Sequence, residues 1–66
     1  MIVSDFTVPE LDYFRMQCNF VGNEKDVFEM RSRGIPLEEI AEILNTSVTH
    51  IGRISQKVNN KIKKVQ

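Results

Sequence analysis

The sequence predicts an all-α fold, a small bundle of four helices within one domain that spans residues 1–66. Apolar residues in the second half of the chain recur at spacings of three and four, which is the period of a helix with one buried face. Residues that start helices (Ser, Thr, Pro) and residues that end them (Gly, Asn) stand at the edges of the expected segments. A chain of this length is close to the lower size limit for a stable core, so stability must come from helix packing.

Residues 1–6 show no clear period and are expected to form a short N-terminal arm. A supporting helix is expected over residues 7–19. Thr7 and Glu10 have the spacing of a capping box, and Pro9 fits the first turn, where its missing N–H costs nothing. One face of this helix is expected to pack inward, and it consists of Leu11, Phe14 and Cys18, with Tyr13 and Met16 beside it.

A second helix is expected over residues 23–33, ended by Gly34 at the position where helices favour a left-handed residue. Acids at its start and bases at its end complement the helix dipole. These charged residues are Glu24, Asp26, Arg31 and Arg33. The residues expected to face the core are Val27, Phe28 and Met30.

Residues 36–65 predict two helices joined by a tight turn. In the first, four apolar residues fall within about 100° of one another; they are Leu37, Ile40, Ala41 and Leu44. Three acids lie on the opposite face, namely Glu38, Glu39 and Glu42. Asn45 tolerates the left-handed conformation that ends a helix, and Ser47 is a strong N-cap for the next one. The turn is therefore expected to be two or three residues long, and the helices must cross steeply, which is the geometry of a helix-turn-helix.

The last helix is expected over residues 48–64, about 25 Å at 1.5 Å per residue. Its apolar stripe is continuous and consists of Ile51, Ile54, Val58, Ile62 and Val65. The C-terminal part of the stripe, Ile62 and Val65, lies beyond the length of helix that a helix-turn-helix needs. Its end either packs on the first helix or meets a second molecule, for example in a homodimer, and the sequence leaves both alternatives open.

Charge is strongly segregated although the formal net charge is zero. Residues 1–50 contain all nine acids and four bases, whereas residues 51–66 contain five bases and no acid. The five bases are Arg53, Lys57, Lys61, Lys63 and Lys64. A cationic surface on an otherwise acidic body attracts and orients a polyanion. The distribution therefore favours a nucleic-acid partner.

The outward pole of the last helix carries Thr49, Arg53 and Gln56, with Asn60 one turn further on. Arg can bind guanine, Gln can bind adenine, and Thr can contact thymine in the major groove. We therefore predict base-reading roles for these three residues. Phosphate contacts are expected from lysines, which position a protein without reading sequence; they are Lys57, Lys61, Lys63 and Lys64. The alternative is an ordinary solvated face, but such faces usually mix both signs of charge.

Two residues of this helix have no assigned purpose from spacing alone. His50 lies on the flank, where a phosphate or base-edge contact is open to it and a metal role is not expected, because no second ligand accompanies it. Gly52 interrupts the helix, where glycine is unfavourable. It either allows close approach of a DNA backbone or of a packed neighbour, or is tolerated without purpose.

Other function classes receive little support. One cysteine, Cys18, and one histidine leave no metal cluster and no internal disulfide, and no cofactor is expected. No nucleophile, glycine-rich phosphate loop or ligand set accompanies the exposed carboxylates, so neither an enzyme nor a small-molecule substrate is expected. The start of the chain lacks the features of a signal peptide, and no segment is apolar enough to span a membrane, so a soluble cytoplasmic protein is expected.

The stretch from residue 23 to residue 57 resembles the helix-turn-helix of region four of bacterial sigma factors and the related LuxR-type DNA-binding domains. The residues that carry the resemblance are Met30, Arg31, Gly34, Glu39, Ile40, Ala41, Ser47 and Ile51. The whole chain looks like small stand-alone sigma-like proteins of bacteria and their mobile elements. It departs from the family pattern at Pro36, Thr46 and Gly52.

The resemblance implies that the last helix enters the major groove of double-stranded DNA. By position it would place five residues nearest the DNA, namely Val48, Thr49, His50, Arg53 and Gln56. The resulting hypothesis is a sequence-specific, DNA-binding transcription regulator of bacteria. The alternative is a sigma-like adaptor that binds RNA polymerase or another protein without DNA, through the acid face of Glu38, Glu39 and Glu42 or through the apolar end of the last helix.

Overall fold

The computed structural model describes residues 3–66, and within that range the chain is helical with no strand. One short 3-10 turn precedes four α-helices. The elements are η1 (Val3–Asp5), α1 (Val8–Gln17), α2 (Asn23–Ser32), α3 (Leu37–Ile43) and α4 (Val48–Val65). The predicted all-α fold of four helices is confirmed.

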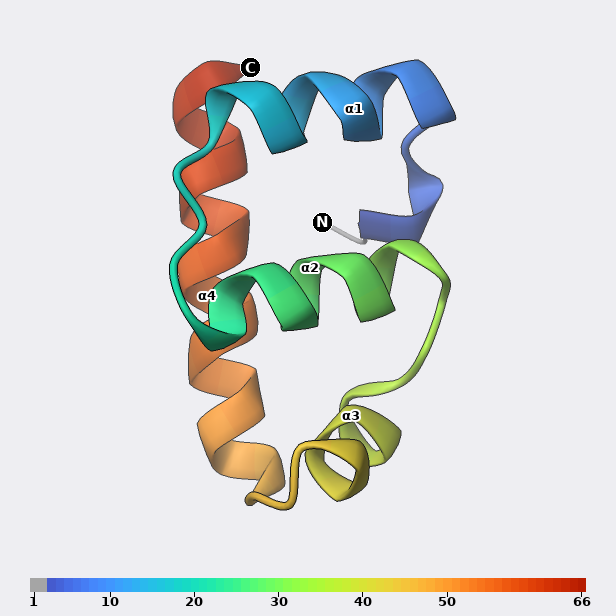
Figure 1. The fold of residues 1–66 in the computed structure, drawn as a ribbon, viewed down its shortest axis with the longest axis vertical. Helices are drawn as coiled ribbons and strands as arrows, with labels where there is room; N and C mark the ends of the chain where they lie inside the picture. Colours follow the sequence, from blue (N-terminus) through green and yellow to red (C-terminus); the bar gives the residue numbers. More distant parts are fainter. Residues whose placement is uncertain (1–2) are drawn as a thin grey trace.

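The long helix α4 is the central element of the bundle. In Figure 1 it runs along the length of the molecule, with α1 beside its C-terminal end, α2 beside its middle and α3 at its N-terminal end. Four residues of α4 are buried: Ile51, Ile54, Val58 and Ile62. They meet Val27 and Phe28 of α2 and Ile40 and Ala41 of α3 in one hydrophobic core. The predicted apolar stripe is therefore the surface on which the other three helices pack.

Local capping signals mark the start of α1 and the end of α2. The Thr7 backbone N–H donates to Glu10 Oε1 at 2.8 Å and the Glu10 N–H donates to Thr7 Oγ1 at 3.4 Å, which is the predicted capping box. Gly34 has the expected positive φ of 80°, and the Ile35 N–H donates to the Met30 carbonyl at 3.2 Å. Both helices are slightly shorter than predicted, because Cys18 and Arg33 already have non-helical backbone angles.

The turn between α3 and α4 contains Leu44 to Ser47, four residues rather than the predicted two or three. Asn45 has a φ of 55°, and the Thr46 N–H donates to the Ala41 carbonyl at 2.9 Å. In this helix ending Leu44 is the C-cap and Asn45 is the left-handed residue that follows it, so Leu44 belongs to the turn and not to α3. Ser47 Oγ then accepts the His50 N–H at 3.1 Å and starts α4. In Figure 1 α3 is seen almost end-on, whereas α4 runs vertically in the plane of the picture, so the two axes cross steeply.

Both chain ends are packed more closely than the sequence suggested. Val3, in the predicted arm, is 2% exposed, and Phe6 lies edge-on to Phe14 with ring centroids 4.9 Å apart; residues 1 and 2 lie outside the described range. At the other end Ile62 is fully buried, and the Tyr13 hydroxyl donates to the Val65 carbonyl at 3.4 Å. The end of the apolar stripe therefore packs on α1 within the same chain.

An ion pair joins α1 to α2. Arg15 donates to Glu29 through Nε at 2.7 Å and through Nη2 at 2.8 Å, and Nη1 donates to Asp12 at 2.6 Å. The guanidinium carbon also lies 5.6 Å from the centroid of the Phe28 ring. Hydrogen bonding to Arg15 lowers the pKa of the Glu29 carboxyl despite its partial burial. The Arg15–Glu29 ion pair thus links α1 and α2, two helices that do not share a long apolar contact surface.

Candidate nucleic-acid interface

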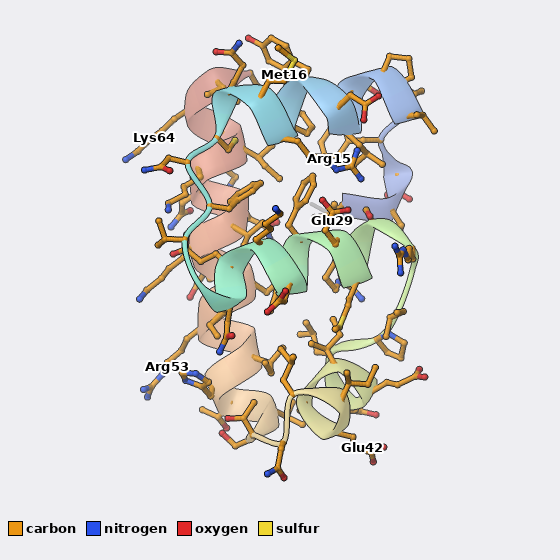
Figure 2. The ribbon with its side chains drawn as sticks, viewed as in Figure 1. Arg15, Met16, Glu29, Glu42, Arg53 and Lys64 are labelled. Atoms are coloured by element: carbon orange, nitrogen blue, oxygen red, sulfur yellow. The ribbon has the colours of Figure 1, made fainter. Side chains whose placement is uncertain are left out.

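The face of α4 opposite the core is exposed and polar along its whole length. The exposed residues at the predicted pole are Thr49, Arg53, Gln56 and Asn60, and those along its borders are Lys57, Lys63 and Lys64. Figure 2 shows Arg53 and Lys64 projecting from α4 away from the other helices. The spacing prediction is therefore met: these side chains share one solvent-facing surface, which we call the α4 outer face.

Among residues 3–66, the cations of the α4 outer face form no ion pair with an acid. No Asp or Glu occurs in the helix from Val48 to Val65. Within residues 3–66 the ion pairs involve only two cationic side chains, Arg15 and Lys61. The positive charges of Arg53, Lys63 and Lys64 are thus directed to solvent, where they can attract an anion. Lys57 is also exposed, although its charge is near enough to Glu24 to help lower the pKa of that carboxyl.

The first turn of α4 presents the remaining residues that the family resemblance places near DNA. Val48 is 46% exposed, and Thr49 and His50 are exposed beside it. The Ser47 cap fixes the direction in which this turn leaves α3, because its side chain is bonded to the His50 N–H. A large exposed apolar residue such as Val48 at the start of an exposed helix is suited to contact a thymine methyl group.

The dimensions of α4 are compatible with B-DNA. An α-helix with its side chains is about 10–12 Å in diameter, and the major groove, about 12 Å wide, admits such a helix. Thr49 and Gln56 are seven residues apart, about 10 Å along the helix axis. Lys64 lies about 22 Å from Thr49 along the same axis. The polar residues of the first two turns can therefore face base edges while the terminal lysines lie near phosphates.

Lys61 does not belong to this face, contrary to the prediction that it contacts phosphate. Its Nζ donates to the Asn19 carbonyl at 2.6 Å and to Glu24 Oε1 at 2.5 Å, and its side chain is only 31% exposed. The same Glu24 oxygen accepts the Val21 N–H at 3.2 Å. The Lys61 hydrogen bond, with help from that N–H, holds the pKa of Glu24 below its ordinary value. Lys61 therefore ties α4 to the α1–α2 connection.

Gly52 is a partly buried residue inside α4 with ordinary helical backbone angles. A Cβ built at this position meets no atom within 4 Å. Close packing against a neighbouring helix, one of the reasons considered from the sequence, is therefore excluded. Glycine in a helix interior costs about 1 kcal/mol relative to alanine, and nothing within the fold compensates for it.

The acid face of α3 is a separate surface. Glu38, Glu39 and Glu42 are all exposed and take part in none of the ion pairs found among residues 3–66. Ile43 is 54% exposed beside them, although the sequence analysis assigned it to neither face. In Figure 2 Glu42 points away from the direction taken by Arg53. An anion bound along α4 would therefore not face these carboxylates directly.

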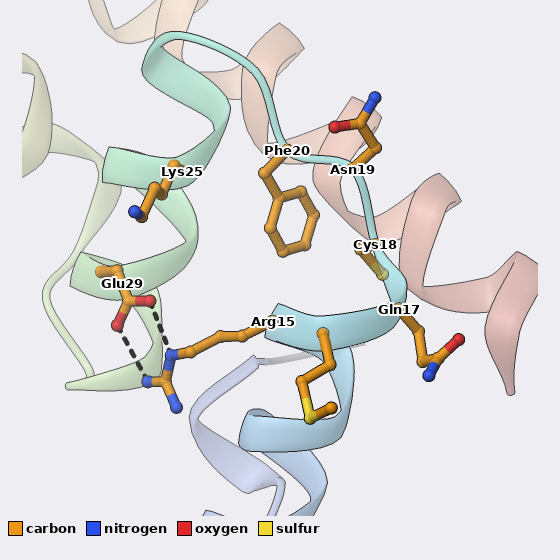
Figure 3. A pocket seen from close by; sticks show the side chains of 8 residues that line it. Arg15, Gln17, Cys18, Asn19, Phe20, Lys25 and Glu29 are labelled. Carbon is orange, nitrogen blue, oxygen red and sulfur yellow. Dashed lines mark hydrogen bonds and ion pairs between the residues drawn. The ribbon is translucent and has the colours of Figure 1, made fainter.

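A surface cavity of about 450 Å³ lies between the end of α1, the connection and α2. Figure 3 shows its lining, which includes Arg15, Cys18, Phe20, Lys25 and Glu29. Two of the three charged residues that line it, Arg15 and Glu29, are already paired with each other. Burial raises the pKa of the Cys18 thiol, which keeps it protonated and a weak nucleophile. The cavity thus offers no activated nucleophile.

Residues 3–66 contain neither a metal-binding cluster nor a helix able to cross a membrane. No group of three or more His, Cys, Asp or Glu side chains in this range is placed to hold a metal ion. None of its helices combines the length and the apolar character that crossing a membrane requires.

Comparison of the chain with protein-family models, with curated proteins and with solved structures found no match in any of the three. The α4 outer face therefore has to be interpreted from its own residues.

Proposed function

We propose that the chain binds double-stranded DNA in a sequence-specific manner by inserting α4 into the major groove, as a bacterial transcription regulator of the helix-turn-helix type. The observation that carries the proposal is the α4 outer face: an 18-residue helix with no acid, whose exposed cations have no partner among the described residues. A polyanion with a groove about 12 Å wide is the ligand that such a surface fits best.

The exposed residues of the first two turns are assigned to base reading. Arg53 is free to donate two hydrogen bonds to guanine O6 and N7, and Gln56 can pair with adenine N6 and N7. Thr49 and Val48 supply methyl groups for thymine, and His50 reaches the flank of the groove. The phosphate contacts fall to the exposed lysines Lys57, Lys63 and Lys64, which position the helix on the duplex.

The contact area of one such domain is small. A single DNA-binding module buries only about 600–1,000 Å² of its surface. We therefore expect that useful affinity requires a second copy of the chain on an adjacent half-site, or RNA polymerase as a partner, as the family resemblance implies. The apolar end of α4 is already covered by α1, so the contact with either partner must use another surface.

Selection of bound duplexes from a random pool at two salt concentrations tests the proposal. A shared sequence should be enriched at both. Binding should weaken with salt, with a slope of log K against log salt of about −2.7 to −3.6 for three or four phosphate contacts. Recovery of no duplex, or binding that salt does not change, would contradict the proposal.

One observation favours a second candidate function, a protein-binding adaptor. The exposed Ile43 follows Glu39 by four residues and Glu42 by one, so an exposed apolar side chain lies beside two unpaired carboxylates on α3, as in an apolar contact with a polar rim. Two double variants separate the candidates. Arg53→Glu with Lys57→Glu should abolish DNA binding and leave an α3-mediated contact intact, whereas Glu38→Lys with Glu42→Lys should do the reverse.

A further inference from the structure

We propose that Gly52 is the point at which the sugar–phosphate wall of the major groove comes closest to α4, so that its missing side chain sets the depth to which the base-reading residues enter the groove. This inference rests on the proposed DNA-binding function. It concerns a residue that makes no side-chain contact itself and acts by positioning its neighbours.

The first step is that the fold does not need a glycine at this position. The backbone of Gly52 is helical, and no positive φ requires the absence of a Cβ. A built Cβ has open space around it to 4 Å, so no neighbouring element of the chain excludes a side chain. The two other glycines are different, since Gly22 and Gly34 have φ values of 55° and 80°.

The second step is the place of Gly52 among the exposed residues. Gly52 follows Thr49 by three residues and precedes Gln56 by four, so it lies one helical turn from each on the same side of α4. Arg53 is its direct neighbour in sequence. Gly52 is therefore the position, between the residues proposed to read bases, where no side chain of the residue itself covers the α4 backbone and where a built Cβ meets no atom within 4 Å.

The third step is the effect of a side chain there. A glycine allows another backbone to approach more closely than any other residue does. A methyl group would hold the groove wall away by a fraction of an ångström to more than 1 Å, and hydrogen bonds to base edges weaken steeply with such displacement. Sequence-specific binding should therefore suffer more than general attraction to phosphate.

The test is a size series at one position, Gly52→Ala, Gly52→Met and Gly52→Leu, because these three residues favour helices to a similar degree. The probes are a duplex of about three helical turns that carries the sequence selected by the wild-type protein, and a mixed-sequence duplex of the same length. Gln17→Leu, which adds an apolar side chain at an exposed position of α1, is the matched control.

We expect every variant of the series to be more stable than the wild type, with a melting temperature raised by about 4–8 °C. Affinity for the selected duplex should fall about fivefold for Ala and about fiftyfold for Leu, the range expected when one base contact is lost. Affinity for the mixed-sequence duplex should change much less, and the control should bind both duplexes like the wild type.

Wild-type affinity for the selected duplex across the series would overturn this inference and leave the proposed function standing. A lowered melting temperature would overturn it too, because it would mean that the fold requires the glycine. If the wild-type protein bound no duplex, the proposed function and this inference would both fail.

Discussion

Replacing Lys61 by methionine should destabilise the fold without changing the salt dependence of DNA binding. Lys61 belongs to the cationic half of the sequence, but its ammonium is bonded to Asn19 and Glu24 rather than directed to solvent. Methionine keeps the length and the helix propensity of the side chain. The variant therefore removes the two hydrogen bonds and the charge, and little else.

The size of the effect follows from the exposure of the two partners. Hydrogen bonds to charged groups contribute about 1.5–3 kcal/mol when well buried, whereas exposed ion pairs contribute about 0.2–1 kcal/mol. The side chains of Lys61 and Glu24 are 31% and 13% exposed, between these limits. Discounting for solvent screening gives a loss of about 1–2 kcal/mol. In a domain of this size that loss lowers the melting temperature by about 4–16 °C.

Urea unfolding and titration of labelled DNA at several salt concentrations measure the two effects on one sample. Lys64→Met is the matched control, since Lys64 lies one turn away on the same helix and is exposed. It should leave the free energy of unfolding within about 0.5 kcal/mol of the wild type. It should also make the salt slope less negative by about 0.9, because one phosphate contact is lost.

The two variants should thus affect different properties. If Lys61→Met changed the salt slope as Lys64→Met does and left stability unchanged, the Lys61 ammonium would be a DNA contact in solution. The assignment of Lys61 to the α1–α2 connection would then be wrong.

Acid should weaken the fold, because the pKa values of Glu24 and Glu29 are held below their ordinary value of 4.5 by Lys61 and Arg15. The two carboxylates stabilise the fold fully above about pH 4.5, and this stabilisation is lost as the pH falls through their lowered folded-state pKa values. Urea unfolding at several pH values should show the decline in the free energy of unfolding. A free energy of unfolding that does not change with pH would contradict the prediction. Ser47→Ala should lower the free energy of unfolding by about 1 kcal/mol because it removes the N-cap of α4, whereas Ser47→Asp should retain most of the stability. Equal melting temperatures for the two variants would show that the cap is unimportant. The Cys18 thiol should react with a disulfide reagent only when the protein unfolds, so a fast reaction under native conditions would show that it is not buried as described.

The parts of the fold that depend on local signals could be predicted from the sequence. The left-handed Asn45, the Ser47 cap and the Thr7–Glu10 capping box each involve residues within a few positions of one another. The α4 outer face was also predictable, because a long, continuous apolar stripe fixes which residues lie opposite it.

Contacts between distant residues could not be predicted in the same way. Lys61 and Glu24 are 37 positions apart, and one sequence gives no sign of which cation an acid will meet. The burial of Val3 likewise depends on how η1 packs against α2, and the packing of Val65 near Tyr13 depends on where α1 lies across α4. The exposure of Ile43 was missed for a related reason, since helical spacing alone does not fix how wide an apolar face the neighbours will cover.

In this bundle the helix with the exposed cationic surface is also the helix against which every other helix packs. Helix α4 therefore cannot unfold locally while the rest of the domain stays folded. Its central amides should exchange their hydrogens with solvent only when the whole domain unfolds. A partner that binds α4 would correspondingly stabilise all four helices at once. The gain would be about 2.7 kcal/mol when the free concentration of the partner is a hundred times its dissociation constant. Under the proposed function, DNA binding and global folding would thus be linked through a single helix.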